Sequence, residues 1–436
     1  MSQNSMTWIW LVIVAIGWQR LVLAADGKSN PSETTVWFDV PAKDFTESSP
    51  LGNGRLGAMM FGGVDEERIV LNESSVWSGS RQDADRPDAY KVLPEIQKLL
   101  LEGKNPEAEA LVDANFTCKG PGSAGAQYGC YQVLGNLHLS FDSGDTNSPV
   151  QNYRRELDLN DATARMEFNR GGVHFTREMF ASAPDQVMVL RLSADQVKHI
   201  SFNARLDRPE HFETSGDGTH ALLMTGQLDN GVDGKGVRYA ARMRVLNQGG
   251  EVSVRGNILK VSKANEVILV IAAGTDFRGF AGRQTKDPLA ATLKDLNRAA
   301  GKSYQSLLKT HAADYQKYFQ RVALRLDPLD AAAAEEPIPE RIKAAEKGPG
   351  DPSLAALHFN FGRYLLISSS RPGGLPPKSS RTLGGGDPHA LGWRLAFGYE
   401  CADELLASGG LQSFGPDRTV VFADFLFAGT GGEDGA

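Results

Sequence analysis

Residues 359–377, Phe-Asn-Phe-Gly-Arg-Tyr-Leu-Leu-Ile-Ser-Ser-Ser-Arg-Pro-Gly-Gly-Leu-Pro-Pro, mark the point where the pattern of the chain changes. Just before them, Asp351-Pro352-Ser353 is a typical helix start. The apolar residues that follow share one helical face: Leu354, Leu357, Phe361 and Leu365. Arg371-Pro372-Gly373-Gly374 cannot continue a helix. We therefore expect residues 351–377 to form the first helix of a helical domain and the loop after it.

Upstream of this helix, residues 34–285 have the alternation of a β-rich domain. Short apolar runs such as Val-Trp-Phe-Asp-Val, Arg-Ile-Val-Leu and Val-Met-Val-Leu-Arg-Leu are separated by turn pairs such as Gly62-Gly63 and Asn230-Gly231. Many short strands with frequent turns predict a large antiparallel β-sandwich. Residues 90–115 interrupt it with the spacing of two short helices.

Two further segments connect the sandwich to the helix. Residues 286–327 have apolar residues at intervals of three and four, which predicts a pair of linker helices. Residues 328–350 are rich in Pro, Ala and Glu and are expected to form an exposed connection between two domains.

The composition and the N-terminal segment indicate which partners and which location to expect. The net charge of −7 and the pI near 5.7 argue against binding to nucleic acid. Residues 1–25 contain a short apolar run that ends in small residues, which predicts a cleaved export signal and a periplasmic or extracellular protein. A membrane anchor or a misplaced start codon is the alternative. No membrane partner is expected after cleavage, and the oligomeric state stays open.

The cysteines, histidines and acidic runs do not indicate a metal site or a catalytic site. Cys118 and Cys130 enclose a Gly-rich loop that an exported chain can close with a disulfide, and two unpaired thiols are the alternative. The eight histidines have no spacing typical of a metal site, so no metal is predicted. The runs Asp65-Glu66-Glu67 and Glu335-Glu336 are expected to lie in a solvated turn and in the connection, because acid catalysis needs a carboxyl in a dry site.

Gly52-Asn53-Gly54-Arg55-Leu56-Gly57 matches the letters of a dinucleotide-binding fingerprint. A true fingerprint lies between a strand and a helix, whereas Ser48-Ser49-Pro50 precedes this motif and the strand-like Ala58-Met59-Met60-Phe61 follows it. We therefore predict no nucleotide at this motif.

Four blocks of the chain together resemble glycoside hydrolase family 95, the inverting α-L-fucosidases. They occupy residues 50–59, 71–79, 131–137 and 362–373, and they occur in the family's order. The resemblance implies an N-terminal β-supersandwich, a helical linker and an (α/α)6 catalytic barrel. It therefore implies a mainly β fold with α elements that ends in the truncated beginning of that barrel.

The resemblance also implies where the chemistry lies. A family Glu is the general acid, and Asn residues oriented by an Asp activate the attacking water. All of them belong to the barrel beyond residue 377, so no catalytic residue is placed on this chain. Four residues of the matching blocks are expected near the substrate: Asn53, Arg55, Asn72 and Trp77. Three others are expected to be structural at the start of the barrel: Gly362, Arg363 and Arg371.

The chain departs from the family pattern after Pro377. The family continues with Asn-Leu-Gln-Gly-x-Trp and later with Asn-x-Gln-Met-Asn-Tyr-Trp-Pro, whereas Lys-Ser-Ser-Arg-Thr-Leu-Gly stands here from residue 378. Codons for residues 378–384 and 400–409, read in the shifted frame, permit both missing blocks. We therefore expect residues 378–436 to be translated out of frame and to have no ordered structure. A genuine divergent tail is the competing hypothesis.

The sequence thus predicts a family of exo-acting, inverting α-L-fucosidases without a cofactor, acting on fucosylated oligosaccharides or polysaccharides. This 436-residue chain is expected to be inactive. The alternative is a carbohydrate-binding or scaffold sandwich, in which Trp37, Trp77 and Tyr131 stack on sugars, although aromatic residues in alternating strands usually belong to a core.

Overall fold

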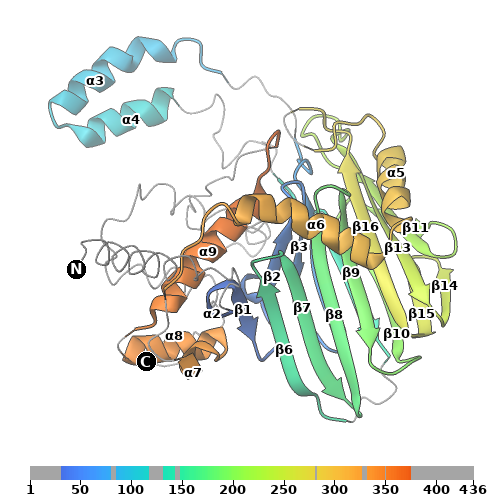
Figure 1. The fold of residues 1–436 in the computed structure, drawn as a ribbon. Coiled ribbons are helices and arrows are strands. Elements are labelled where there is room, and N and C mark those ends of the chain that lie inside the picture. The colour runs from blue at the N-terminus through green and yellow to red at the C-terminus, as the bar shows by residue number, and fades with distance from the viewer. Residues whose placement is uncertain are drawn as a thin grey trace, which may run out of the picture.

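The computed structural model describes residues 31–79, 85–116, 131–142, 148–279, 282–326, 331–348 and 350–374. In these ranges the strands form two antiparallel sheets that face each other (Figure 1). The larger sheet contains, in spatial order, β1 (Thr35–Phe38), β6 (Gln151–Asp158), β7 (Thr163–Arg170), β8 (Val173–Ser182), β9 (Val187–Ala194), β16 (Glu266–Thr275), β13 (Arg238–Gln248), β12 (Ala221–Gln227) and β11 (Glu213–Gly216). The smaller sheet contains β14 (Glu251–Arg255), β15 (Ile258–Ala264), β10 (Ile200–Asp207), β5 (Gly135–Phe141), β4 (Glu66–Glu73), β3 (Leu56–Met60) and β2 (Ser49–Gly52). The predicted sandwich is confirmed.

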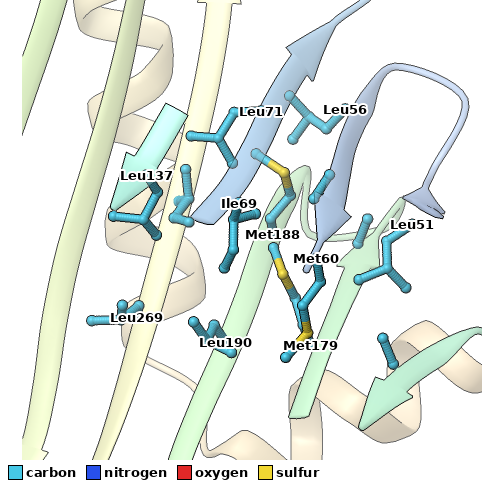
Figure 2. Packing of buried hydrophobic residues seen from close by; sticks show 14 of the residues in the cluster. Leu51, Leu56, Met60, Ile69, Leu71, Leu137, Met179, Met188, Leu190 and Leu269 are labelled. Atoms are coloured by element: carbon cyan, nitrogen blue, oxygen red, sulfur yellow. The ribbon is translucent and has the colours of Figure 1, made fainter. Parts of the chain in front are cut away.

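The main core fills the space between the two sheets (Figure 2). The smaller sheet contributes Leu51, Leu56, Met60, Ile69, Leu71 and Leu137. The larger sheet contributes Met179, Met188, Leu190 and Leu269. Each of these side chains is almost completely removed from water, which is the main favourable contribution to folding.

The larger sheet is buried on its second face as well. In β9, Met188 and Leu190 point into the sandwich, whereas Val187 and Val189 point outward because successive side chains alternate across a strand. Two helices cover these outward residues, α5 (Pro288–Ala300) and α6 (Tyr304–Phe319) (Figure 1). They are the helices predicted at 286–327, and their first turns are capped by side-chain oxygens of Asp287 and Ser303.

The described part of the predicted connection, residues 331–348, is helical and partly buried, although its composition indicates an exposed segment. It contains α7 (Ala331–Ala334) and α8 (Ile338–Lys347), and α8 packs Ile338 and Ile342 into the main core. Proline lies at the start of α8, where a helix tolerates it. Arg341 is buried and donates to Asp351 Oδ2 at 2.8 Å, which joins α8 to the helix that follows.

That following helix is α9 (Pro352–Ser369), the helix expected at the start of the catalytic domain. Asp351 caps it by accepting the backbone N–H groups of Ser353 and Leu354. Its apolar face packs into the main core together with Tyr315 and Phe319 of α6. Tyr364 also donates its hydroxyl to the carbonyl of Pro50 in β2, so α9 is attached to the linker helix and to the sandwich.

The insertion at 90–115 forms the expected helical pair. The 3-10 turn η2 (Ala89–Val92) leads into α3 (Leu93–Leu101) and α4 (Asn105–Asn115), which stand clear of the sandwich in Figure 1. Two short elements complete the described part, α2 (Pro31–Thr34) and η1 (Phe45–Glu47). The signal at 1–25, the cysteine pair Cys118 and Cys130, and the segment 378–436 lie outside the described residues.

Candidate functional site

The turn between β2 and β3 meets the C-terminal end of α9. The backbone N–H of Gly54 donates to the carbonyl of Ser368 at 2.8 Å. Gly54 has a φ of +85°, and a Cβ there would lie 2.5 Å from Cγ and 3.0 Å from the backbone N of Arg371. Only glycine fits this combination of backbone conformation and close approach. The motif that resembles a dinucleotide fingerprint is therefore a hairpin turn that holds α9 against the sandwich.

Asn53 stabilises this turn from within. Its side chain is buried, and its Oδ1 accepts the backbone N–H groups of Arg55 at 3.0 Å and Leu56 at 2.7 Å. Its Nδ2 donates to the carbonyl of Ser182 in the larger sheet at 2.9 Å. The amide therefore links the turn to the opposite sheet.

Arg55 makes a second link between the sheets. Its Nη1 donates to Glu73 Oε1 at 3.0 Å and to the carbonyl of Ala273 in β16 at 2.7 Å, and its Nε donates to Gln186 Oε1 at 2.7 Å. Burial lowers the pKa of Arg55, and the Glu73 carboxylate offsets part of that effect. Glu73 is fully buried and also accepts from the backbone N–H and the hydroxyl of Ser75.

Asn72 and Trp77 lie beside this link at the same end of β4. Asn72 is 1% exposed, and its Oδ1 accepts from the Tyr131 hydroxyl at 3.4 Å. Trp77 is half-buried, donates its indole N–H to the carbonyl of Ser74, and packs edge to face on Tyr131 with ring centroids 5.8 Å apart. The structure therefore brings all four predicted substrate-proximal residues to one end of the sandwich. Their proximity to substrate stays a prediction.

Two arginines of the α9 segment bind the linker helix α6. Arg363 Nη2 donates to the carbonyl of Phe319 at 2.5 Å, and the guanidinium lies 4.7 Å from the centroid of that ring. Arg371 Nη1 donates to Asp314 Oδ2 at 3.1 Å. Gly362 is buried within α9. The contacts around this junction fix the turn and α9 in place. The Glu73 carboxylate is bound by Arg55, and the Asp314 carboxylate is bound by Arg371.

The described residues show no group of three or more His, Cys, Asp or Glu side chains placed to hold a metal ion. In the same ranges, no helix has both the length and the apolar character needed to cross a membrane.

Two family profiles match the chain on either side of this junction. The N-terminal domain of glycosyl hydrolase family 65 matches residues 36–280, and the glycosyl hydrolase family 95 catalytic domain matches residues 303–379. The chain belongs to the glycoside hydrolases that carry the family 65 N-terminal domain, and its later part is similar to the start of the family 95 catalytic domain. The family 95 match begins one residue before α6, so the profile includes the second linker helix in the catalytic domain.

Named relatives agree with this assignment. The chain is 33% identical over 383 residues to "Alpha-L-fucosidase 2" of Arabidopsis thaliana, which covers 81% of this chain and 44% of that protein. It is 33% identical over 365 residues to "Probable alpha-fucosidase A" of Aspergillus niger, covering 79% and 44%. The chain therefore spans less than half the length of these relatives.

Among solved structures, "Putative kojibiose phosphorylase from human microbiome" superposes with a TM-score of 0.45 at 10% identity. The match covers 77% of this chain and 41% of the other. This likeness is too distant to carry an inference.

The sandwich also contains a polar cluster that the predictions from the sequence do not include. Glu67, predicted to lie in a solvated turn, is 1% exposed and faces the interior between the sheets. Its strand, β4, starts at Glu66, so the acidic run leaves the turn after Asp65. The signal was present in the period of two, because Glu67 has the same parity as Ile69 and Leu71, which face the core.

Proposed function

We propose that the gene of this chain derives from an exo-acting α-L-fucosidase that hydrolyses fucosylated oligosaccharides or polysaccharides with inversion. The match to the family 95 catalytic domain at residues 303–379 and the two fucosidase-named relatives support the glycoside hydrolase activity and the sugar. Inversion needs an acid and a base separated widely enough to admit a water molecule. Both groups are expected in the part of the catalytic domain that follows α9.

We further propose that the 436-residue chain does not hydrolyse fucosides. The observation that carries this proposal is the amino-acid sequence from residue 378 onward, which no longer matches the family. A shifted reading frame from that point permits the missing family blocks. The family 95 match ends at residue 379, which supports the same point of departure. We also propose that residues 1–25 act as an export signal and that the protein works in the periplasm or outside the cell.

The nucleotide sequence across codon 377 tests the frame directly. The shifted frame should encode barrel-like text that contains both missing blocks and no early stop codon. A stop codon soon after codon 377, or text without the blocks, would exclude the frameshift and favour a divergent tail.

The stereochemistry is tested on the protein made from the restored frame. With an aryl α-L-fucoside as substrate, proton NMR in the first minutes should show β-L-fucose as the initial product, because one displacement inverts the anomeric carbon. Initial α-L-fucose would contradict inversion, and the absence of any fucose release would contradict the proposed activity.

A second candidate function is glycan binding by the sandwich without hydrolysis. The half-buried Trp77 and Tyr131 favour it, since aromatic rings at the end of a sandwich offer a stacking surface for sugars. Isothermal titration of the purified chain with fucosylated oligosaccharides distinguishes the two. Binding that is lost in Trp77→Ala, while the fold is retained, would support this candidate.

A further inference from the structure

A polar cluster at the β3–β4 turn ties the two sheets together. The turn belongs to the smaller sheet, and side chains of the larger sheet bind three successive carbonyls in it. The Tyr153 hydroxyl donates to Gly62 at 2.7 Å, and Arg177 donates to Gly63 and, at 2.6 Å, to Val64. These hydrogen bonds join the turn of the smaller sheet to the larger sheet.

Glu67 completes the cluster from the smaller sheet. Its Oε1 accepts the backbone N–H groups of Phe61 and Gly62, each at 3.0 Å. Its Oε2 is buried and has no hydrogen-bond partner in the described structure. The nearest cation is Arg177, whose Nη1 lies 3.7 Å from Oε2 and is already bound to the Gly63 carbonyl.

Arg177 therefore has two competing sets of acceptors. In this structure it binds the turn carbonyls, and its guanidinium lies 3.6 Å from the centroid of the Phe141 ring. A 3.7 Å separation from Oε2 exceeds a hydrogen bond by less than 1 Å. A small movement of Arg177 toward an ionised Glu67 would form a charge-assisted pair and release the carbonyls of Gly63 and Val64.

We propose that Glu67 and Arg177 form a proton-operated latch between the sheets. With Oε2 protonated, Arg177 holds the β3–β4 turn against the larger sheet. When Oε2 loses its proton to solvent, Arg177 pairs with the carboxylate and the turn loosens. The latch is independent of the hydrolytic activity proposed above, because none of its residues lies at the α9 junction.

The electrostatics support a transition near neutral pH. Burial raises the pKa of Glu67 to about 7, and the Arg177 charge and the two backbone N–H groups oppose that increase. Burial also lowers the pKa of Arg177 to about 10, so the cation persists through the transition. The charged and titratable groups near the pair are Asp65 in the turn, Tyr153 and Arg155 in β6, and Arg170 in β7. Glu47 in η1 acts on Arg155, and Asp142 and His199 line the same cavity as Arg177.

The sign of the effect follows from linkage. A carboxyl with a raised folded-state pKa binds its proton more tightly in the folded protein than in the unfolded one. Its contribution to stability is therefore complete below the unfolded pKa and is lost as the pH rises through about 7. Between pH 5.5 and 8.5, the folding equilibrium constant should fall about thirtyfold from this group alone.

The experiment compares the full chain with Glu67→Gln, which keeps the Oε1 acceptor and cannot ionise. Chemical unfolding is measured at pH 5.5, 7.0 and 8.5, and hydrogen exchange of the 61–68 peptide is measured at the same pH values after correction for intrinsic rates. The wild type should lose stability and protection as the pH rises, and Glu67→Gln should not show this component. Glu66→Gln, on the solvent side of the same strand, should retain the wild-type profile.

Arg177→Met keeps the proposal testable if Glu67→Gln does not fold. Removing the cation that favours the ionised carboxyl should move the loss of stability to higher pH. Identical pH profiles in wild type and Glu67→Gln would overturn the latch, and so would an unchanged midpoint in Arg177→Met.

Discussion

Gly54→Ala is the substitution that tests most directly how α9 is attached to the sandwich. The new residue must adopt a φ of +85°, which costs an L-residue about 1–2 kcal/mol. Its Cβ would also lie 2.5 Å from Arg371 Cγ and 3.0 Å from the Arg371 backbone N. Part of this overlap is with backbone, so the end of α9 must move, at a typical overpacking cost of about 1–3 kcal/mol. The free energy of unfolding should therefore fall by about 2–5 kcal/mol.

The matched control is Gly172→Ala in the β7–β8 turn. Gly172 has a φ of +77°, and a Cβ there meets nothing within 4 Å. It therefore carries the backbone cost without the overlap. Urea unfolding should show Gly54→Ala to be the less stable variant. Equal stability of the two variants would refute the close packing of the turn on α9.

Two more substitutions test the polar groups that join the elements. Arg55→Met leaves the fully buried Glu73 without its cation and should lower the free energy of unfolding by about 3–5 kcal/mol, measured by urea titration; a loss below 1 kcal/mol would contradict the buried pair. His311 donates to the carbonyl of Asp161 at 2.9 Å, and burial lowers its pKa to about 4. The folded protein therefore binds the second imidazole proton of His311 less tightly than the unfolded chain does. The free energy of unfolding falls as the pH drops from 6.5 toward 4, by about 3 kcal/mol at most. His311→Gln should remove this component of acid unfolding, and an unchanged acid profile would contradict a neutral buried imidazole.

Much of the fold could be predicted because local patterns decide it. The period of two in strands such as β10, and the period of 3.6 in α5, α6 and α9, each follow from which side chains must leave water. The order of the strands could not be predicted in this way. Contacts such as β16 between β9 and β13 depend on pairings between distant segments, which no local pattern records.

The errors have equally local causes. The composition of residues 328–350 predicts an exposed connection, although Ile338 and Ile342 are spaced as one face of a short helix. The acidic run predicts a solvated turn for Glu67, although the alternation of β4 places this residue on the core side. Asn53 and Arg55 bind carbonyls of the larger sheet that are distant in the sequence. Sequence spacing cannot predict such contacts. The family resemblance located the junction, and the contacts show how it is built.

The measurement that tests the central claim most directly is release of L-fucose from an aryl α-L-fucoside by two purified proteins. One is the 436-residue chain, and the other is the product of the same gene with the frame restored at codon 377. We expect no turnover by the first and catalytic turnover by the second, because the proposed acid and base lie beyond α9. Turnover by the 436-residue chain itself would contradict the account, since catalytic groups would then have to lie within this chain.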